Sequence, residues 1–169
     1  MFGLTLEALR VAHATEIIAF EQENRTFFAQ FVPDRGDAYF IPANMERFLA
    51  EIEAEQARGE CFLYLVRSSS GELVGRVNLV EVQGTTASLG YRIGAKHGGQ
   101  GYATEAVRLA LTAAASRGIT RVTAMTTSGN VGSQIVLRRN GFAETDGSPK
   151  HLDVNGTQQK AIHFERRLG

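Results

Sequence analysis

The first sixty residues combine one short extended segment with two helical ones. Residues 4–11 have the composition of a strand, and residues 14–28 then carry apolar side chains at the three- and four-residue spacing of an amphipathic helix. Residues 44–58 repeat this helical spacing and are followed by Gly59, a residue type that commonly ends helices. The stretch between the two helices, residues 32–40, is irregular. We therefore predict a strand and two helices before residue 60.

From residue 60 onward the pattern changes to that of a sheet. Residues 61–67, 72–82 and 86–93 are rich in β-branched and aromatic side chains, and short turn-like links join them. Such links leave no room for a crossover helix, so the three strands are predicted to be antiparallel.

The last third of the chain returns to helical spacing between strands. A glycine-rich loop precedes a predicted helix over residues 102–117 and a strand over 119–127, and a connection of this length predicts that the two strands it joins are parallel. A helix over 131–140 and a closing strand over 161–167 follow. The predicted sheet is therefore mixed, in a single domain over residues 1–169.

Composition narrows the class of partner. The chain has no formal net charge and no long basic block, which argues against direct nucleic-acid binding. No apolar run reaches the roughly 20 residues of a membrane span, and Glu7 interrupts the first short one, so a cytoplasmic location without a membrane partner is expected. Cys61 is the only cysteine, which excludes an internal disulfide, and the histidines lack metal-ligand spacing, so no metal is expected.

The glycine-rich loop at residues 94–101 is the main chemical signal. It leads into a helix, whose first backbone N–H groups are unpaired and favour an anion such as phosphate. A Walker A loop is excluded because no lysine follows the last glycine. A dinucleotide loop fits poorly, since Thr104 stands where its third glycine belongs and residues 121–140 contain no acidic residue. A purely structural loop stays open as the alternative.

Four segments in order resemble the GNAT acetyltransferase superfamily, in particular its RimJ/RimL-like branch. They are Leu-Gly-Tyr-Arg-Ile-Gly at residues 89–94, Gly-Gln-Gly-Tyr-Ala-Thr-Glu-Ala at 99–106, Asn-Val-Gly-Ser at 130–133 and Asn-Gly-Phe at 140–142. The resemblance implies an α/β (α+β) fold: a mixed, mostly antiparallel, splayed sheet of about 6–7 strands with about 4 helices.

The resemblance also implies a binding site for acetyl-coenzyme A. Backbone N–H groups of the loop would hold the diphosphate and the preceding strand would hold the pantetheine arm, although Gly98 stands where the family motif usually has glutamine, arginine or an aromatic residue. The residues implied are Leu89, Tyr91, Arg92, Ile93, Gly98, Gly99, Gln100, Gly101, Tyr102, Ala103, Thr104, Asn130 and Ser133. Asn130 is also a candidate helix cap.

The catalytic groups are less sharply defined. Leu137 occupies the position of the tyrosine with which many family members protonate the departing thiolate, so the resemblance transfers that role to Ser133. Glu81 is a candidate general base if the strand is regular and buries it on the face of Val77 and Leu79. The alternative is an exposed carboxylate at the end of the hairpin. His151 and Asp153 are candidates of similar weight, in a segment, residues 149–156, that borders the acceptor cleft in similar proteins.

The expected reaction is direct acetyl transfer to a primary amine. The branch favours a protein or peptide N-terminal amine, of which ribosomal proteins are the best-known example. A small-molecule amine and a non-catalytic coenzyme-A-binding regulatory module are the alternatives, and the sequence leaves a homo-oligomer open. An α-amino group, with its pKa near 8, needs far less help from a base than a lysine side chain does.

Overall fold

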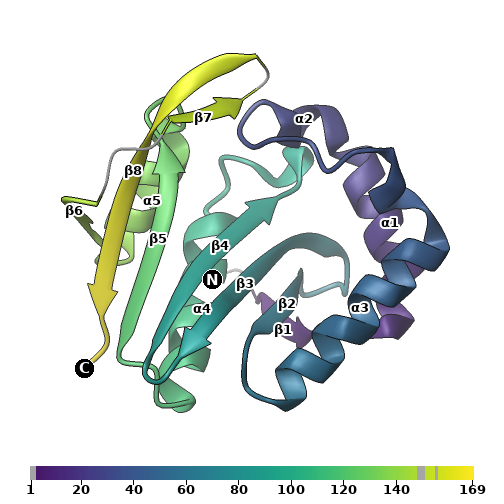
Figure 1. Ribbon diagram of the computed structural model, residues 1–169, viewed down its shortest axis with the longest axis horizontal. Helices are drawn as coiled ribbons and strands as arrows, with labels where there is room; N and C mark the ends of the chain where they lie inside the picture. The colour runs from purple at the N-terminus through teal and green to yellow at the C-terminus, as the bar shows by residue number, and fades with distance from the viewer. Residues whose placement is uncertain (1–2, 148–150, 155) are drawn as a thin grey trace.

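Figure 1 shows the computed structural model of the chain, which describes residues 3–147, 151–154 and 156–169. Within these residues one eight-stranded sheet is flanked by five α-helices. The strands are β1 (Thr5–Ala8), β2 (Phe62–Arg67), β3 (Leu73–Gln83), β4 (Thr86–Ile93), β5 (Arg121–Thr127), β6 (Ala143–Thr145), β7 (His151–Val154) and β8 (Thr157–Arg167). The helices are α1 (Ala14–Glu23), α2 (Arg25–Ala29), α3 (Pro42–Ala57), α4 (Tyr102–Ser116) and α5 (Val131–Arg139), with short 3-10 segments η1 (Val11–His13), η2 (Asp37–Phe40) and η3 (Ala95–His97).

The strands lie in the order β1-β2-β3-β4-β5-β8-β6, with β7 paired to β8. β4 and β5 are parallel, whereas the other paired neighbours run antiparallel. The predicted mixed sheet is confirmed, including the parallel pair on either side of α4. A connection through a helix places its two strands side by side in the same direction.

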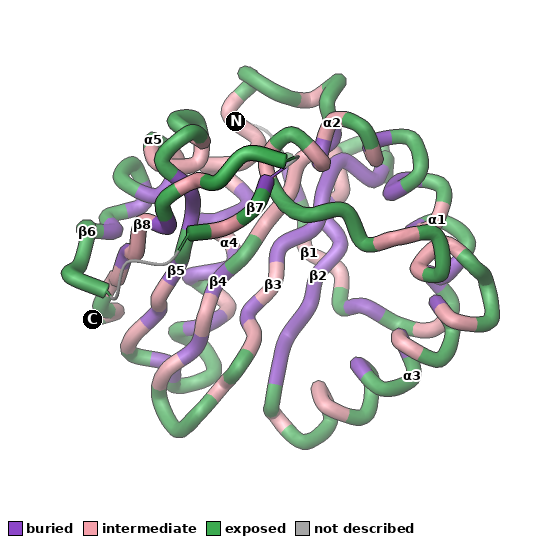
Figure 2. The backbone as a smooth tube through the Cα atoms, turned by 45° about the horizontal axis from the view of Figure 1, so that its top comes forward, coloured by how far each residue is buried: buried purple, intermediate pink, exposed green. Residues whose placement is uncertain are grey.

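Hydrophobic cores cover both faces of the sheet. In β2, Phe62, Tyr64 and Val66 join the core that contains α4, whereas Leu63 and Leu65 join the core that contains α1 and α3. Figure 2 shows the resulting concentration of buried residues along the central strands. A strand buried on both faces reads as a continuous apolar run, which explains why residues 61–66 show no alternation with polar residues.

Some predicted elements differ from the observed ones. The helix expected over residues 14–28 is broken at Asn24 into α1 and α2. The closing strand begins at Thr157 rather than at residue 161, and β6 and β7 were not predicted. Both missed strands are short and largely exposed, so neither has the apolar pattern by which a strand is recognised in a sequence.

The pairing of β4 with β5 stops halfway along both strands. Thr86 to Leu89 pair with Arg121 to Ala124, and no pair follows between them. Beyond this point β4 stays paired with β3, and β5 stays paired with β8. The two parallel strands therefore diverge toward their carboxyl ends, as Figure 1 shows, and the predicted splayed sheet is confirmed.

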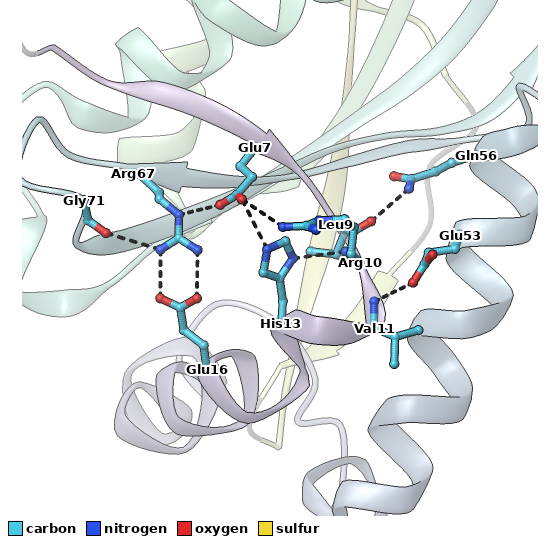
Figure 3. Close-up of polar contacts among 10 residues, drawn as sticks. All are labelled: Glu7, Leu9, Arg10, Val11, His13, Glu16, Glu53, Gln56, Arg67 and Gly71. Carbon is cyan, nitrogen blue, oxygen red and sulfur yellow. Dashed lines mark hydrogen bonds and ion pairs between the residues drawn. The ribbon is translucent and has the colours of Figure 1, made fainter.

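A cluster of charged groups ties the first strand to the helices around it (Figure 3). The Arg67 guanidinium contacts Glu7 at 2.6 Å and Glu16 at 2.8 Å, and so joins β2 to β1 and to α1. Hydrogen bonds to Arg67 lower the pKa of both carboxyl groups below their ordinary value. Because these side chains are 36% and 42% exposed, solvent screening limits each ion pair to less than about 1 kcal/mol.

The lowered pKa values predict a loss of stability in acid. The unfolded chain binds protons at these two carboxyl groups before the folded chain does, so their stabilisation is complete above the ordinary carboxyl pKa and disappears as the pH falls below it. Arg67→Met should therefore lose less stability than the wild type between about pH 5 and pH 3. Urea unfolding measured across this range, with Arg47→Met as an exposed control, checks the prediction. Parallel pH curves for wild type and Arg67→Met would contradict it.

Candidate active site

Two cavities meet where β4 and β5 diverge. The loop cavity, about 410 Å³, is lined by residues of the glycine-rich loop, α2, the end of β4, the start of α4 and one side of α5. The gap cavity, about 260 Å³, is lined by residues from β3, by β4 and β5 beyond their last pair, and by the segment after α2. Six residues line both cavities: Phe31, Val32, Tyr91, Arg92, Asn130 and Ser133. An elongated ligand could thus extend from one cavity into the other.

The loop cavity contains the N-terminus of α4, which has no side-chain cap. Gly101 precedes α4 with φ 82°, a left-handed conformation. Gly99 is also left-handed, with φ 70°. These two glycines turn the chain so that the first N–H groups of α4 stay open to a ligand, and the positive end of the helix dipole favours a negative one. This terminus has the features of a diphosphate site.

Asn24 holds the start of this loop in place. Its amide nitrogen donates to the Phe20 carbonyl at 2.9 Å, and its Oδ1 accepts from the Ala95 N–H at 2.8 Å. The same interactions accompany the break between α1 and α2. Gly94 packs so closely here that an added Cβ would lie 3.3 Å from Asn24 Oδ1.

Asn24→Ala should therefore destabilise the protein by about 1–3 kcal/mol, because it leaves a partly buried N–H without its partner. It should also weaken binding at the loop. Urea unfolding measures the first effect and calorimetric titration with acetyl-coenzyme A the second. Asn44→Ala is the matched control, since Asn44 also donates to a backbone carbonyl, at 3.0 Å, but in an exposed position. Equal losses in the two variants would contradict the proposed role.

Ser133 lies in the first turn of α5, at the junction of the two cavities. Asn130 Oδ1 accepts from the Ser133 N–H at 3.1 Å, so Asn130 caps this helix. Burial raises the pKa of the Tyr91 phenol, and a side-chain hydrogen bond with Ser133 partly opposes that rise. Ser133 and Tyr91 thus place two hydroxyl groups together at the point where β4 leaves β5.

The structure brings together most of the predicted cofactor residues. Eleven of them line the loop cavity: Tyr91, Arg92, Ile93, Gly98, Gly99, Gly101, Tyr102, Ala103, Thr104, Asn130 and Ser133. Leu89 lines the gap cavity instead. Gln100 is exposed and its side chain donates to the Lys96 carbonyl at 3.2 Å, so it stabilises the loop and lines neither cavity.

The regular strand face on which Glu81 would be a buried base does not form, and the structure matches the alternative, an exposed carboxylate near the end of the hairpin. The register of β3 against β4 shifts between Val80 and Gln83, and Glu81 adopts a left-handed φ of 51° within this irregular stretch. The irregularity turns Glu81 out of the face that Val77 and Leu79 bury against α4, and its side chain is exposed. It lines a third cavity, between β3 and α3, which shares Arg35, Arg76 and Asn78 with the gap cavity.

His151 and Asp153 lie on β7 with exposed side chains. Successive strand residues point to opposite faces, and it is Leu152, between them, that lines the gap cavity. Asp153 Oδ1 accepts from the Gly156 N–H at 2.9 Å, the arrangement of a turn. The segment therefore borders the gap through Leu152, while residues 149, 150 and 155 lie outside the described part of the chain.

Sequence reasoning missed the charged side of the gap cavity. Arg35, Arg76 and Arg92 line it, and Arg76 and Arg92 both contact the buried Glu21. The signal for Glu21 was present, since it falls within the apolar stripe of the first helix, between Phe20 and Phe28. A carboxylate in such a stripe is buried with a cationic partner. The partners, however, come from β3 and β4, and the sequence alone did not pair them with α1.

In residues 3–147, 151–154 and 156–169, no three His, Cys, Asp or Glu side chains are grouped as ligands for a metal ion. Over the same described ranges, none of the helices is both long and apolar enough to cross a bilayer.

Comparison with known proteins gives concordant matches. A family model described as an acetyltransferase (GNAT) domain matches residues 3–143. The chain is 31% identical over 153 residues to the probable N-acetyltransferase YjcK of Bacillus subtilis (strain 168), covering 88% of this chain and 84% of that protein.

Two solved structures share the fold over almost the whole chain. Ribosomal-protein-S5-alanine acetyltransferase from Vibrio fischeri has a TM-score of 0.91 at 20% identity, covering 99% of this chain and 94% of that one. Spermidine N-acetyltransferase from Vibrio cholerae, in complex with CoA and spermine, has a TM-score of 0.83 at 18% identity, covering 98% and 95%. At these identities the two likenesses establish the fold alone.

Proposed function

This chain belongs to the GNAT acetyltransferase family and is an acetyl-coenzyme-A-dependent N-acetyltransferase, and on that premise we propose that its acceptor is the N-terminal α-amine of a protein or peptide. The observation that carries the proposal is the lining of the gap cavity. In the described part of the chain this lining contains no Asp, Glu or His side chain that could accept a proton from the amine.

The acidity of the acceptor then decides which amines can react. Deprotonating an α-amine costs about 1 kcal/mol at pH 7, whereas a lysine-like amine costs between about 4 and 5 kcal/mol. A site without a strong base can use an α-amine with water as the proton acceptor, but the free-energy cost of deprotonation makes its reaction with a lysine-like amine much slower. An N-terminal amine is therefore the acceptor that this cavity suits best.

The loop cavity fits acetyl-coenzyme A. We assign its diphosphate to the open backbone N–H groups between Gly99 and Thr104, at the start of α4. No side chain caps this helix, and two glycines leave the approach to these N–H groups free of side chains. The pantetheine arm would follow β4, whose backbone beyond Leu89 is not paired with β5. Tyr91, Asn130 and Ser133 lie where this path enters the gap cavity.

In the proposed reaction the neutral amine nitrogen attacks the thioester carbon from the gap cavity. The new C–N bond forms as the C–S bond breaks, and the amine loses one proton to water. Backbone N–H groups of β4 stabilise the developing negative charge on the carbonyl oxygen. Ser133 gives its proton to the departing thiolate and regains one through Tyr91 or water.

The proposal is tested by steady-state release of free thiol with three kinds of acceptor: peptides with a free N-terminus, the same peptides with a blocked N-terminus and an internal lysine, and spermidine. We expect turnover with the first group at pH 7 and little with the others. Turnover restricted to spermidine or to internal lysine would overturn the proposed acceptor. Protection against thermal unfolding by acetyl-coenzyme A but not by NAD tests the cofactor assignment independently of any acceptor.

A further inference from the structure

The gap cavity is lined by three arginines. Arg35 comes from the segment after α2, Arg76 from β3 and Arg92 from β4, and no carboxylate accompanies them in the lining that the described residues form. An arginine side chain stays protonated at any accessible pH, so these charges are permanent. A cavity with this lining favours an anion and disfavours a second cationic group.

One buried carboxylate partly balances these charges. Glu21 Oε2 lies 3.2 Å from Arg76 Nη1, and Glu21 Oε1 lies 2.7 Å from Arg92 Nη1. A single negative charge thus serves two guanidinium groups. Arg35 forms no ion pair with any residue that the structure describes, and its guanidinium lies 5.1 Å from the centre of the Tyr39 ring. The three arginines therefore keep an excess of positive charge.

Two buried polar side-chain atoms of β3 also lack a hydrogen-bond partner among the described residues. They are Arg76 Nε, a donor, and Asn78 Oδ1, an acceptor. The Arg76 side chain is only 4% exposed, and both residues line the gap cavity. Buried polar atoms normally find a partner, and here a ligand in the cavity could supply both.

The register of β3 separates the roles of these two residues. Asn78 lies opposite Gly90, just past the last β4–β5 pair, where the thioester would meet the amine. Arg76 lies opposite Arg92, two residues farther along. A site for an amine at Asn78 and a site for an anion at Arg76 are thus about 7 Å apart along the strand.

The other carboxylates near the site lie outside the lining of the gap cavity. Asp34 and Asp37 both contact Arg25, at 2.8 and 2.9 Å, and Asp34 lines a small neighbouring cavity with Arg35 and Arg92. Glu55, Glu60 and Glu81 line the third cavity, between β3 and α3, where Glu60 is paired with Arg58. Arg35, Arg76 and Asn78 line both this cavity and the gap cavity. Glu81 lies three residues, or about 10 Å, beyond Asn78, on the side away from Arg76.

From this arrangement we propose that the acceptor carries an anionic group, a carboxylate or a phosphate, about 7 Å from its reacting amine. The matching substrate is a peptide N-terminus with an acidic or phosphorylated second residue. Its amine donates to Asn78 Oδ1, and its anion accepts from Arg76 and Arg35. The inference rests on the proposed function, because it assigns a substrate class to the same cavity.

The first test uses peptides that differ only at the second residue: glutamate, phosphoserine, glutamine or lysine. We expect kcat/KM for the glutamate peptide to exceed that for the glutamine peptide by at least about tenfold, and the lysine peptide to be poorest. The phosphoserine peptide distinguishes a phosphate from a carboxylate preference. Moving the glutamate to the fourth position should abolish the advantage. Equal rates, or a preference for lysine, would overturn the inference.

The second test changes the exposed arginine. Arg35→Gln should lower the preference for glutamate over glutamine by about 3- to 10-fold through the acceptor KM, with acetyl-coenzyme A affinity retained, and Arg35→Lys should restore part of it. Arg47→Gln, an exposed arginine on α3 outside these cavities, is the control. An unchanged preference in Arg35→Gln, or an equal loss in Arg47→Gln, would exclude the proposed contact.

A binding experiment separates this inference from the proposed function. The same four peptides, N-acetylated as products, are titrated calorimetrically into protein saturated with coenzyme A. Tighter binding of the acidic products supports the arginine site even if no peptide is turned over, in which case only the proposed function fails. Turnover of N-terminal amines with equal binding of all four products rejects the arginine site and leaves the proposed function standing.

Discussion

Replacing Ser133 with alanine is expected to lower kcat by about 100-fold, the lower end of the range for a lost general acid. Ser133 lines both cavities and lies in the first turn of α5, beside the path that we assign to the thioester. The variant keeps the Ser133 backbone N–H that Asn130 caps, so the helix should form normally. Single-turnover acetylation of a peptide measures the chemical step, and titration with acetyl-coenzyme A shows whether binding is retained.

Ser116→Ala is the matched control, because Ser116 donates to a backbone carbonyl on the exposed side of α4. Tyr91→Phe extends the test to the neighbouring hydroxyl. Burial raises the pKa of the Tyr91 phenol, so it stays protonated to a higher pH than an exposed tyrosine and the wild-type rate should persist into alkaline solution. An unchanged rate in Ser133→Ala at every pH would remove Ser133 from the mechanism.

Replacing Gly101 with alanine is expected to weaken acetyl-coenzyme A binding by about tenfold, equivalent to about 1.4 kcal/mol. Gly101 has φ 82°, and an alanine in that left-handed conformation costs about 1–2 kcal/mol. The chain can relieve this strain only by turning the first N–H groups of α4 away from their present direction. Calorimetric titration gives the affinity, and urea unfolding gives the accompanying loss of stability.

Gly98→Ala is the matched control, because it adds the same methyl group to the loop without placing an alanine in a left-handed conformation. Gly98 has an ordinary φ of −68°, and a Cβ added there would lie 3.5 Å from the Ala95 carbonyl oxygen, a normal contact distance. Its stability should change by less than about 0.5 kcal/mol. If both variants bound acetyl-coenzyme A with equal affinity, the left-handed turn at Gly101 would not be what shapes the site.

Most of the fold could be predicted because its elements follow local rules. The sequence itself contains the apolar runs of β2, β3 and β4 and the helical spacing of α4. The length of the connection between β4 and β5 then predicts that these two strands are parallel. The break at Asn24 could not be predicted in this way. At this break Asn24 accepts a hydrogen bond from Ala95, which is 71 residues away in the chain.

In the candidate site, too, the parts formed by consecutive residues could be predicted and the parts that the fold assembles could not. The loop from Gly98 to Thr104 was identified because consecutive residues form it, and the structure places all but Gln100 along one cavity. The arginines of the gap cavity come from three separate segments, and only the fold brings them together around Glu21. For Glu81 the sequence left two alternatives, and the exposed one is observed because a left-handed residue changes which face the strand presents, a change that no adjacent glycine signals.

The early end of the β4–β5 pairing has a consequence for the ligand as well as for the protein. Past Leu89, two stretches of main chain face a common space without bonding to each other, so an extended amide-containing molecule can lie between them as a partial extra strand. Pantetheine, which contains two amides in a linear chain, has that character. When acetyl-coenzyme A is added, hydrogen–deuterium exchange should then slow at the backbone N–H groups on the facing edges of β4 and β5 together, because one ligand would form hydrogen bonds with both strands.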